Sequence, residues 1–196
     1  MPASNDFNGH GQSEGRFQDM TVPNEIEDAK HVYEYVAKMP GVTSVSLTGH
    51  SQGGVVASMT AGILGTQKVK SLALMAPAAV LREDAIRGRF TAQFDSLNPP
   101  AAIEMDGLKL GGNMTSAVSL MNMPILSYAD EIKNAVMVLH GEKAHSRYFG
   151  EDAFKKLKGD NKELVIVPGA SHVDLYDNKA KIPFDKLAAF FDKNLK

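Results

Sequence analysis

The hydrophobic residues of this chain alternate between helically spaced sets and short continuous runs. The first twenty residues are polar and rich in glycine, which predicts a loop. From Thr21 to Met39, apolar residues recur at the three- and four-residue spacing that is typical of a helix. Pro23 stands where a first helical turn tolerates proline, and Pro40-Gly41 predicts the end of the helix. The pattern thus indicates a loop followed by one amphipathic helix.

Short apolar runs farther along the chain predict strands, and helical stretches lie between most of them. The predicted strands are 42–48, 69–75, 135–139 and 163–167. The predicted helices after the first one are 55–64, 151–157 and 184–195. Near-continuous apolar strands that alternate with helices are typical of a parallel sheet covered on both faces. We therefore predict an α/β fold.

Residues 81–133 interrupt this alternation. The interval contains Pro99-Pro100, Gly111-Gly112 and two weakly amphipathic pieces, and it fits no position in the sheet. We interpret it as an insertion that lies over one edge of the sheet as a lid. The length of 196 residues suits one domain with a sizeable core, so we assign residues 1–196 to a single domain that carries this insertion.

Composition and charge exclude several classes of partner. The formal net charge of −2 favours neither nucleic acid nor an anionic membrane. No apolar run approaches the ~20 residues of a membrane span, and the N-terminus lacks the basic and apolar regions of a signal peptide. Because the chain has no cysteine, it has no disulfide, thiolate metal ligand or cysteine nucleophile. We expect a cytoplasmic protein with no nucleic-acid or membrane partner.

The sequence Gly-His-Ser-Gln-Gly, residues 49–53, stands between a predicted strand and a predicted helix. By itself this frame is weak evidence, because a serine that caps a helix in a glycine turn gives the same pattern. In a strand–turn–helix setting, however, the serine projects its hydroxyl at the carboxyl edge of the sheet, and the glycines allow strand and helix to approach closely. We predict that Ser51 is a nucleophile and that the N–H of Gln52 stabilises an oxyanion.

A serine nucleophile requires a base, and His172 is the best-placed histidine. It lies directly after the last predicted strand, in a loop that returns to the same sheet edge as Ser51. A histidine in a loop is more often a solvated surface residue, but the order serine then histidine is that of enzymes with such a nucleophile turn. We predict that His172 is the general base.

The acid that orients this base is expected on the loop after the strand 135–139. Glu142 is the first carboxylate there and is our prediction, although a solvated loop carboxylate is an equally common interpretation. The alternatives are Asp84, Glu151 and Asp152.

His140, Glu142 and His145 are near enough in sequence to suggest metal ligands. No second cluster in the sequence completes a coordination shell around them. We expect neither a metal nor a cofactor.

Several stretches of the chain resemble known hydrolases. The runs DFNGHGQSEGRFQDMTVPNEIEDA, GHSQGGVVASM and APAA are similar to the α/β-hydrolase superfamily, and within it to bacterial cinnamoyl (feruloyl) esterases. The runs HGEKAHSRYFGEDAF and VIVPGASHVDLYD look more like the dienelactone-hydrolase and peptidase-like members. The resemblance implies a three-layer α/β-hydrolase sandwich with a mainly parallel sheet and a lid. It places the nucleophile on Ser51, the base on His172 and one oxyanion donor on the N–H of Gln52.

Two departures from the resembling families concern the catalytic machinery. The esterases usually carry their acid at the position of Ala144, so Glu142 would have to substitute for it. Family members also have several strands and a helix, including a second oxyanion donor, before the motif that here follows Met1 to Asn5. Without those strands, we expect the strand 42–48 to lie at an open sheet edge, which favours self-association. We also expect the chain alone to be a poor esterase, because one oxyanion donor is missing.

A third departure concerns the substrate. The aspartate that helps the esterases to hold a phenolic substrate falls on Asp84, whereas their glutamine and tyrosine fall on Thr91 and Met114. We expect Asp84 and His50, the neighbour of the nucleophile, to bind substrate. We also expect most of the hydrogen bonds to a phenolic group of the substrate to be lost.

Together these features predict a serine hydrolase that cleaves small-molecule carboxylic esters, short-chain or of the aryl and cinnamoyl type, through an acyl-enzyme on Ser51. One alternative is a lactone or amide/peptide hydrolase of the same fold. Another is a truncated, catalytically poor scaffold that binds a small acyl ligand or a partner protein.

Overall fold

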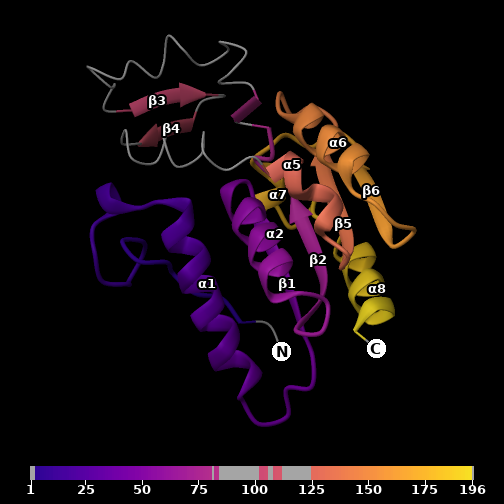
Figure 1. The fold of residues 1–196 in the computed structure, drawn as a ribbon. Coiled ribbons are helices and arrows are strands. Elements are labelled where there is room, and N and C mark those ends of the chain that lie inside the picture. Colours follow the sequence, from indigo (N-terminus) through magenta and orange to yellow (C-terminus); the bar gives the residue numbers. More distant parts are fainter. Residues whose placement is uncertain (1–2, 81, 84–101, 106–107, 112–124, 196) are drawn as a thin grey trace.

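The computed structural model of the chain describes residues 3–80, 82–83, 102–105, 108–111 and 125–195 (Figure 1). Its centre is a parallel sheet of four strands in the order β1-β2-β5-β6. The strands are β1 (Val45–His50), β2 (Val69–Met75), β5 (Ala135–Gly141) and β6 (Lys162–Val167). The four predicted strands and their parallel arrangement are confirmed, and β1 forms one edge of the described sheet. Strand β1 begins and ends later than the predicted strand 42–48. It continues up to the residue before Ser51.

Helices cover both faces of this sheet. Those of the described chain that reach about one turn or more are α1 (Val22–Ala37), α2 (Gln52–Leu64), α5 (Ile125–Tyr128), α6 (Arg147–Lys156), α7 (Asp174–Asp177) and α8 (Phe184–Asn194). On one face, α2 and α6 pack against Leu72 and Val136. On the other face, α7 and α8 pack against Ala73 and Met137. Because neighbouring residues of a strand point to opposite faces, each strand serves both layers, which confirms the predicted sandwich.

Helix α1 packs on α2 and not in the centre of the sheet (Figure 1). The hydroxyl of Thr21 accepts a hydrogen bond from the N–H of Asn24 at 3.3 Å and so caps the helix. Val22 and Ile26 then pack with Val55 of α2 in a buried apolar cluster. This contact brings the first turn of α1 to the first turns of α2, close to the end of β1.

The predicted lid, residues 81–133, is described only in part. It contains β3 (Ala102–Met105) and β4 (Leu108–Gly111), which form an antiparallel sheet of their own. The 3-10 helix η2 (Ala129–Glu131) follows α5, and its Ala129 belongs to the apolar core on the α2 and α6 side of the main sheet. Another 3-10 helix, η1 (Phe17–Asp19), lies in the N-terminal loop. The described part of the interval adds no strand to the main sheet, and its interpretation as an inserted lid stays a prediction.

Among the residues that the structure describes, no helix combines the length and the apolar character that crossing a bilayer would require.

Candidate active site

Ser51 lies at a sharp turn between β1 and α2. Its backbone has φ 52° and ψ −116°, a left-handed conformation that is rare for residues with a side chain and costs about 1–3 kcal/mol. The turn is held by a hydrogen bond from the N–H of Ser51 to the carbonyl of Met75 at 2.9 Å. A Cβ on Gly49 would lie 2.1 Å from the carbonyl oxygen of Gly53, so only glycine fits where strand and helix meet. The predicted strand–turn–helix setting of Ser51 is therefore present in detail.

The helix that follows Ser51 presents its N-terminus at this turn. Gln52 is the first residue of α2, and the first N–H groups of a helix have no partner within it. The N–H of Gly54 is already used by the carbonyl of Ser51 at 3.0 Å. The backbone N–H of Gln52 lies at the positive end of the helix dipole, where a negative oxygen would be stabilised.

The loop after β6 brings His172 to the residue that precedes Ser51. Nε2 of His50 donates a hydrogen bond to the carbonyl oxygen of His172 at 2.9 Å, and the centroids of the two rings are 4.9 Å apart. Because the carbonyl can only accept, the hydrogen of the His50 ring is on Nε2. Burial lowers the pKa of His50, which favours this neutral form. His50, which the sequence predicts to bind substrate, is thus hydrogen-bonded to the loop that carries the predicted base.

Asp174 fixes the same loop from its other end. Its carboxylate accepts hydrogen bonds from the N–H and the hydroxyl of Ser171, each at 2.8 Å, and from the side-chain amide of Asn178 at 2.7 Å. These bonds, led by the one from the Ser171 backbone, lower the pKa of Asp174 to about 2. His172 therefore lies between Ser171 and Asp174, which are hydrogen-bonded to each other, and its side chain is only partly exposed.

Among the described residues, a serine hydroxyl lies within hydrogen-bond distance of Nδ1 of His172. Oγ of Ser146, a buried residue before α6, lies 2.8 Å from this nitrogen. The same oxygen lies 3.1 Å from Nε2 of His140, which is fully buried in β5. Burial, followed by the neighbouring charge of His172, lowers the pKa of His140 to about 3, so its ring is neutral. Neither Ser146 nor His140 was among the catalytic residues that the sequence predicted.

The carboxylate of Glu142, the predicted orienting acid, is directed to another group. Its Oε2 accepts a hydrogen bond from the backbone N–H of Gly169 at 2.8 Å, and its side chain is exposed. Two of the alternative acids face basic residues of their own helix: Glu151 pairs with Arg147 at 2.9 Å, and Asp152 pairs with Lys155 at 3.1 Å. This geometry counts against Glu142 as the acid, because its carboxylate is bonded to the backbone N–H of Gly169. Asp84, Thr91 and Met114 lie outside the described residues.

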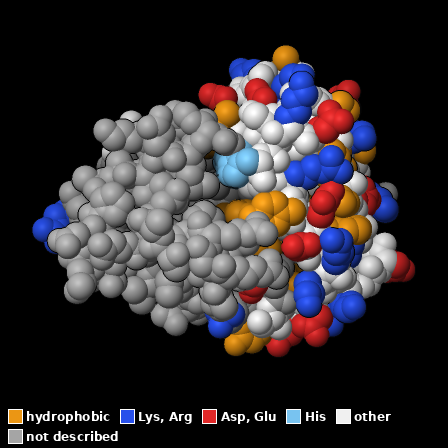
Figure 2. All heavy atoms as spheres, turned by 90° about the horizontal axis from the view of Figure 1, so that it is seen from above, with side chains coloured by type: hydrophobic (Ala, Val, Ile, Leu, Met, Phe, Trp, Pro, Cys, Tyr) orange, Lys and Arg blue, Asp and Glu red, His pale blue; other side chains and the backbone are white. Residues whose placement is uncertain are grey.

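Histidines gather around His172. The ring centroids of His140 and His145 lie 6.2 Å and 5.8 Å from that of His172, in addition to the contact with His50. Figure 2 looks down on this end of the molecule and shows histidine at the surface beside hydrophobic side chains. In the part of the chain that the structure describes, no three histidine, cysteine or acidic residues are arranged to hold a metal ion.

Comparison with known proteins identifies the family. Residues 3–105, more than half of the chain, match the hydrolase family described as serine aminopeptidase, S33. The chain belongs to this family. The predicted α/β-hydrolase fold is confirmed by solved structures as well. Est1E from Butyrivibrio proteoclasticus with ferulic acid bound has a TM-score of 0.78 at 28% identity, over 96% of this chain and 75% of that one.

A second relative is known from both sequence and structure. The uncharacterized protein PA2218 of Pseudomonas aeruginosa is 57% identical over 83 residues, which are 42% of this chain and 22% of that protein. Its crystal structure has a TM-score of 0.74 at 28% identity, over 94% of this chain and 72% of that one. The uncharacterized protein YcjY of Escherichia coli is 35% identical over 60 residues, 30% of this chain and 20% of that protein. The sequence matches thus span about a fifth of the length of these two relatives.

Proposed function

We propose that this S33-family hydrolase cleaves carboxylic esters through an acyl-enzyme on Ser51. The observation that carries the proposal is the position of His172, which is hydrogen-bonded to the neighbour of Ser51 and held through its Nδ1 by Ser146. The hydroxyl oxygen of Ser51 attacks the acyl carbon while Nε2 of His172 takes its proton, and the same proton then passes to the leaving alcohol. Water hydrolyses the acyl-enzyme with the roles of His172 reversed.

The mechanism requires one direction of the hydrogen bonds around His172. For Nε2 of His172 to accept a proton, Nδ1 must carry the ring hydrogen, which it then donates to Oγ of Ser146. The Ser146 hydroxyl in turn donates to Nε2 of His140, which can accept because its ring is neutral. In this direction, Ser146 and His140 together hold the orientation of the base, which a carboxylate does in most serine hydrolases.

An uncharged partner stabilises the imidazolium less than a carboxylate does. Hydrogen bonds to ionised groups are about twice as strong as those between neutral groups. We therefore expect Ser146 to orient His172 well but to contribute less to stabilising its charged form in the transition state. The oxyanion that forms at the same time is stabilised by the backbone N–H of Gln52 at the N-terminus of α2.

The likeness to Est1E, which binds ferulic acid, supports esters as the substrate class, and the family description favours a second candidate, the hydrolysis of aminoacyl amides. Both reactions use the same nucleophile and base.

The experiment compares wild type with Ser51→Ala on p-nitrophenyl butyrate and on an aminoacyl p-nitroanilide. It is combined with labelling by a fluorophosphonate probe and mapping of the labelled residue by mass spectrometry. Ester hydrolysis and labelling of Ser51 in the wild type, both lost in the variant, are the expected result. A label on another residue, or hydrolysis that persists in Ser51→Ala, contradicts the proposal. Faster cleavage of the anilide than of the ester selects the second candidate.

A further inference from the structure

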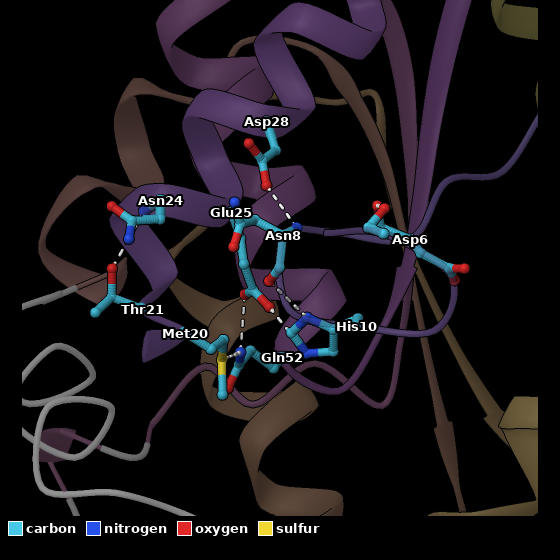
Figure 3. Close-up of polar contacts among 10 residues, drawn as sticks. Asp6, Asn8, His10, Met20, Thr21, Asn24, Glu25, Asp28 and Gln52 are labelled. Carbon is cyan, nitrogen blue, oxygen red and sulfur yellow. Dashed lines mark hydrogen bonds and ion pairs between the residues drawn. The ribbon is translucent and has the colours of Figure 1, made fainter. Parts of the chain in front are cut away.

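A buried carboxylate of α1 lies beside the residue that follows the nucleophile (Figure 3). Glu25 is only 4% exposed, and its Oε2 accepts a hydrogen bond from the side-chain Nε2 of Gln52 at 2.8 Å. The same nitrogen also donates to the sulfur of Met20 at 3.1 Å. The two N–H groups of the Gln52 amide are thus directed to two different residues, and the side chain is held between α1 and the segment before it.

The other oxygen of this carboxylate faces the N-terminal loop. Nε2 of His10 lies 3.7 Å from Oε1 of Glu25. The Nδ1 of His10 donates to the carbonyl of Asn8 at 3.2 Å, and the ring makes edge contacts with Phe7 and Phe17 at centroid distances of 6.3 Å and 5.2 Å. These contacts hold the ring of His10 beside the carboxylate of Glu25.

The loop that carries His10 is itself fixed to α1. The backbone N–H of Asn8 donates to Oδ2 of Asp28 at 2.9 Å, one turn after Glu25 (Figure 3). Within the loop, the carboxylate of Asp6 accepts the N–H of Gln12 at 2.9 Å. The contact between His10 and Glu25 is therefore built by a folded loop and does not depend on a single surface side chain.

A buried carboxylate at this position is costly for the fold. Burial raises the pKa of Glu25, the hydrogen bond from Gln52 and the charge of His10 oppose this rise, and Asp28 adds to it. An apolar side chain would fill the same space without the desolvation penalty. An apolar side chain would lose two contacts that the carboxylate makes, the hydrogen bond from Gln52 and the pair with His10.

We infer that Glu25, supported by His10, is a positioning residue for the oxyanion-binding N–H of Gln52. The inference rests on the proposed function. Gln52 directly follows the strained Ser51, so the direction of its N–H depends on the backbone torsions of that turn. A side chain that is anchored on α1 restrains those torsions from outside the turn. The N-terminal loop is thereby part of the catalytic geometry without touching the substrate.

The first experiment compares Glu25→Ala and Glu25→Gln with wild type in steady-state hydrolysis of p-nitrophenyl butyrate. Loss of a whole oxyanion donor lowers turnover about 100- to 1,000-fold, so a displaced donor should lower kcat by roughly tenfold. KM should change less than about twofold, because the ground-state carbonyl binds the donor weakly. Glu25→Gln keeps an oxygen that accepts from Gln52, so its kcat should stay within about threefold of wild type.

A reciprocal exchange makes the test independent of Glu25→Ala folding well. Gln52→Glu alone places a second carboxylate against the buried Glu25 and should lower kcat strongly. When Glu25→Gln is added, the amide and the carboxylate exchange places and the hydrogen bond is restored in the opposite direction. Recovery of kcat by at least threefold in the double variant relative to Gln52→Glu is expected. Equal rates in the single and the double variant overturn the inference.

Ile26→Val is the matched control, because it trims a buried residue of the same helical turn and lowers stability by about 0.5–1.5 kcal/mol. Its kcat should equal that of wild type when both are folded at the assay temperature. An unchanged kcat in Glu25→Ala, or an equal loss in Ile26→Val, overturns the inference and leaves the proposed function intact. Hydrolysis that persists in Ser51→Ala instead removes the proposed function, and the inference with it.

Discussion

The hydroxyl oxygen of Ser146 lies 2.8 Å from Nδ1 of His172, at the atom where most serine hydrolases place a carboxylate. The serine is buried, and it is bonded in turn to a neutral, buried histidine. Among the residues that the structure describes, the base is thus bonded at Nδ1 to one uncharged group, which is bonded to a second. These two groups orient the ring and carry no charge of their own.

Replacement of Ser146 by alanine should lower kcat about tenfold to hundredfold. The change removes a hydrogen bond that orients the ring of His172. Loss of a carboxylate at this position costs about 10,000-fold, and loss of a neutral partner should cost less. Steady-state kinetics with p-nitrophenyl butyrate measure the effect. Glu142→Gln is the matched control and should stay within about threefold of wild type, because its carboxylate contacts Gly169. A larger loss in Glu142→Gln than in Ser146→Ala restores Glu142 as the acid.

Replacement of Ser51 by glycine should abolish activity and raise stability. Glycine adopts a φ of 52° without the steric cost that serine bears, so the free energy of unfolding should increase by about 1 kcal/mol. Urea denaturation followed by circular dichroism measures the change. Ser51→Ala keeps the strain and should differ little from wild type in stability. Equal stability of the glycine and alanine variants contradicts a strained turn.

Stability should fall as the pH is lowered from about 6.5 toward 3, with a contribution from His140. Its folded pKa of about 3 lies below the ordinary 6.5, so over this range the unfolded chain binds a proton that the folded chain does not. The contribution is complete above about pH 6.5 and declines by up to about 1.4 kcal/mol per pH unit within the window. His140→Gln cannot take up this proton. Urea midpoints at pH 6.5 and 4.5 should therefore differ less in the variant than in wild type, and an equal difference contradicts a neutral His140.

Replacement of Gly49 by alanine should disrupt the turn around Ser51. The new Cβ would lie 2.1 Å from the carbonyl oxygen of Gly53, a backbone atom that cannot move without displacing α2. We expect a loss of more than about 2 kcal/mol in the free energy of unfolding, together with loss of activity. Gly62→Ala, in the same helix, has no atom within 4 Å of its new Cβ and should stabilise the protein by about 0.5–1 kcal/mol. Thermal denaturation of the two variants separates the effects.

Activity on short aliphatic or simple aryl esters should at least equal that on hydroxycinnamates. Thr91 and Met114 stand where the resembling esterases have a glutamine and a tyrosine, and neither replaces the hydrogen bonds of those residues to a phenol. The ratio of kcat/KM for p-nitrophenyl butyrate and methyl ferulate decides the question. A strong preference for methyl ferulate contradicts this prediction.

Most of the fold could be predicted because apolar patterning is strong where both faces of a sheet are covered. β2 matches its predicted bounds, and α8 differs by one residue at its end. The short helix α7 and the strands β3 and β4 were missed. Four-residue elements leave too few positions for a period to emerge, and in α7 the hydrogen bonds of Asp174 accompany a single buried apolar residue, Leu175.

The candidate site was predictable only where chemistry leaves a local signature. Ser51 has one, because the turn requires glycines at fixed positions. Ser146 has none, since a serine hydroxyl near a histidine follows from how β5 and α6 pack. The direction of the Glu142 carboxylate likewise depends on the N–H of Gly169, which belongs to a loop on another strand.

The strand order also has a consequence for how the protein acquires its activity as it folds. Ser51 follows β1 at one edge of the described sheet, His172 follows β6 at the other, and the contact between His50 and His172 spans 122 residues of sequence. An intermediate that has formed only β1, α2 and β2 already contains the strained turn but has no base within reach. Each further parallel strand must close a long chain segment before it pairs, which is slow. During refolding, hydrolysis should therefore return with the docking of β5 and β6, later than the first helical signal, and so record the completion of the sheet.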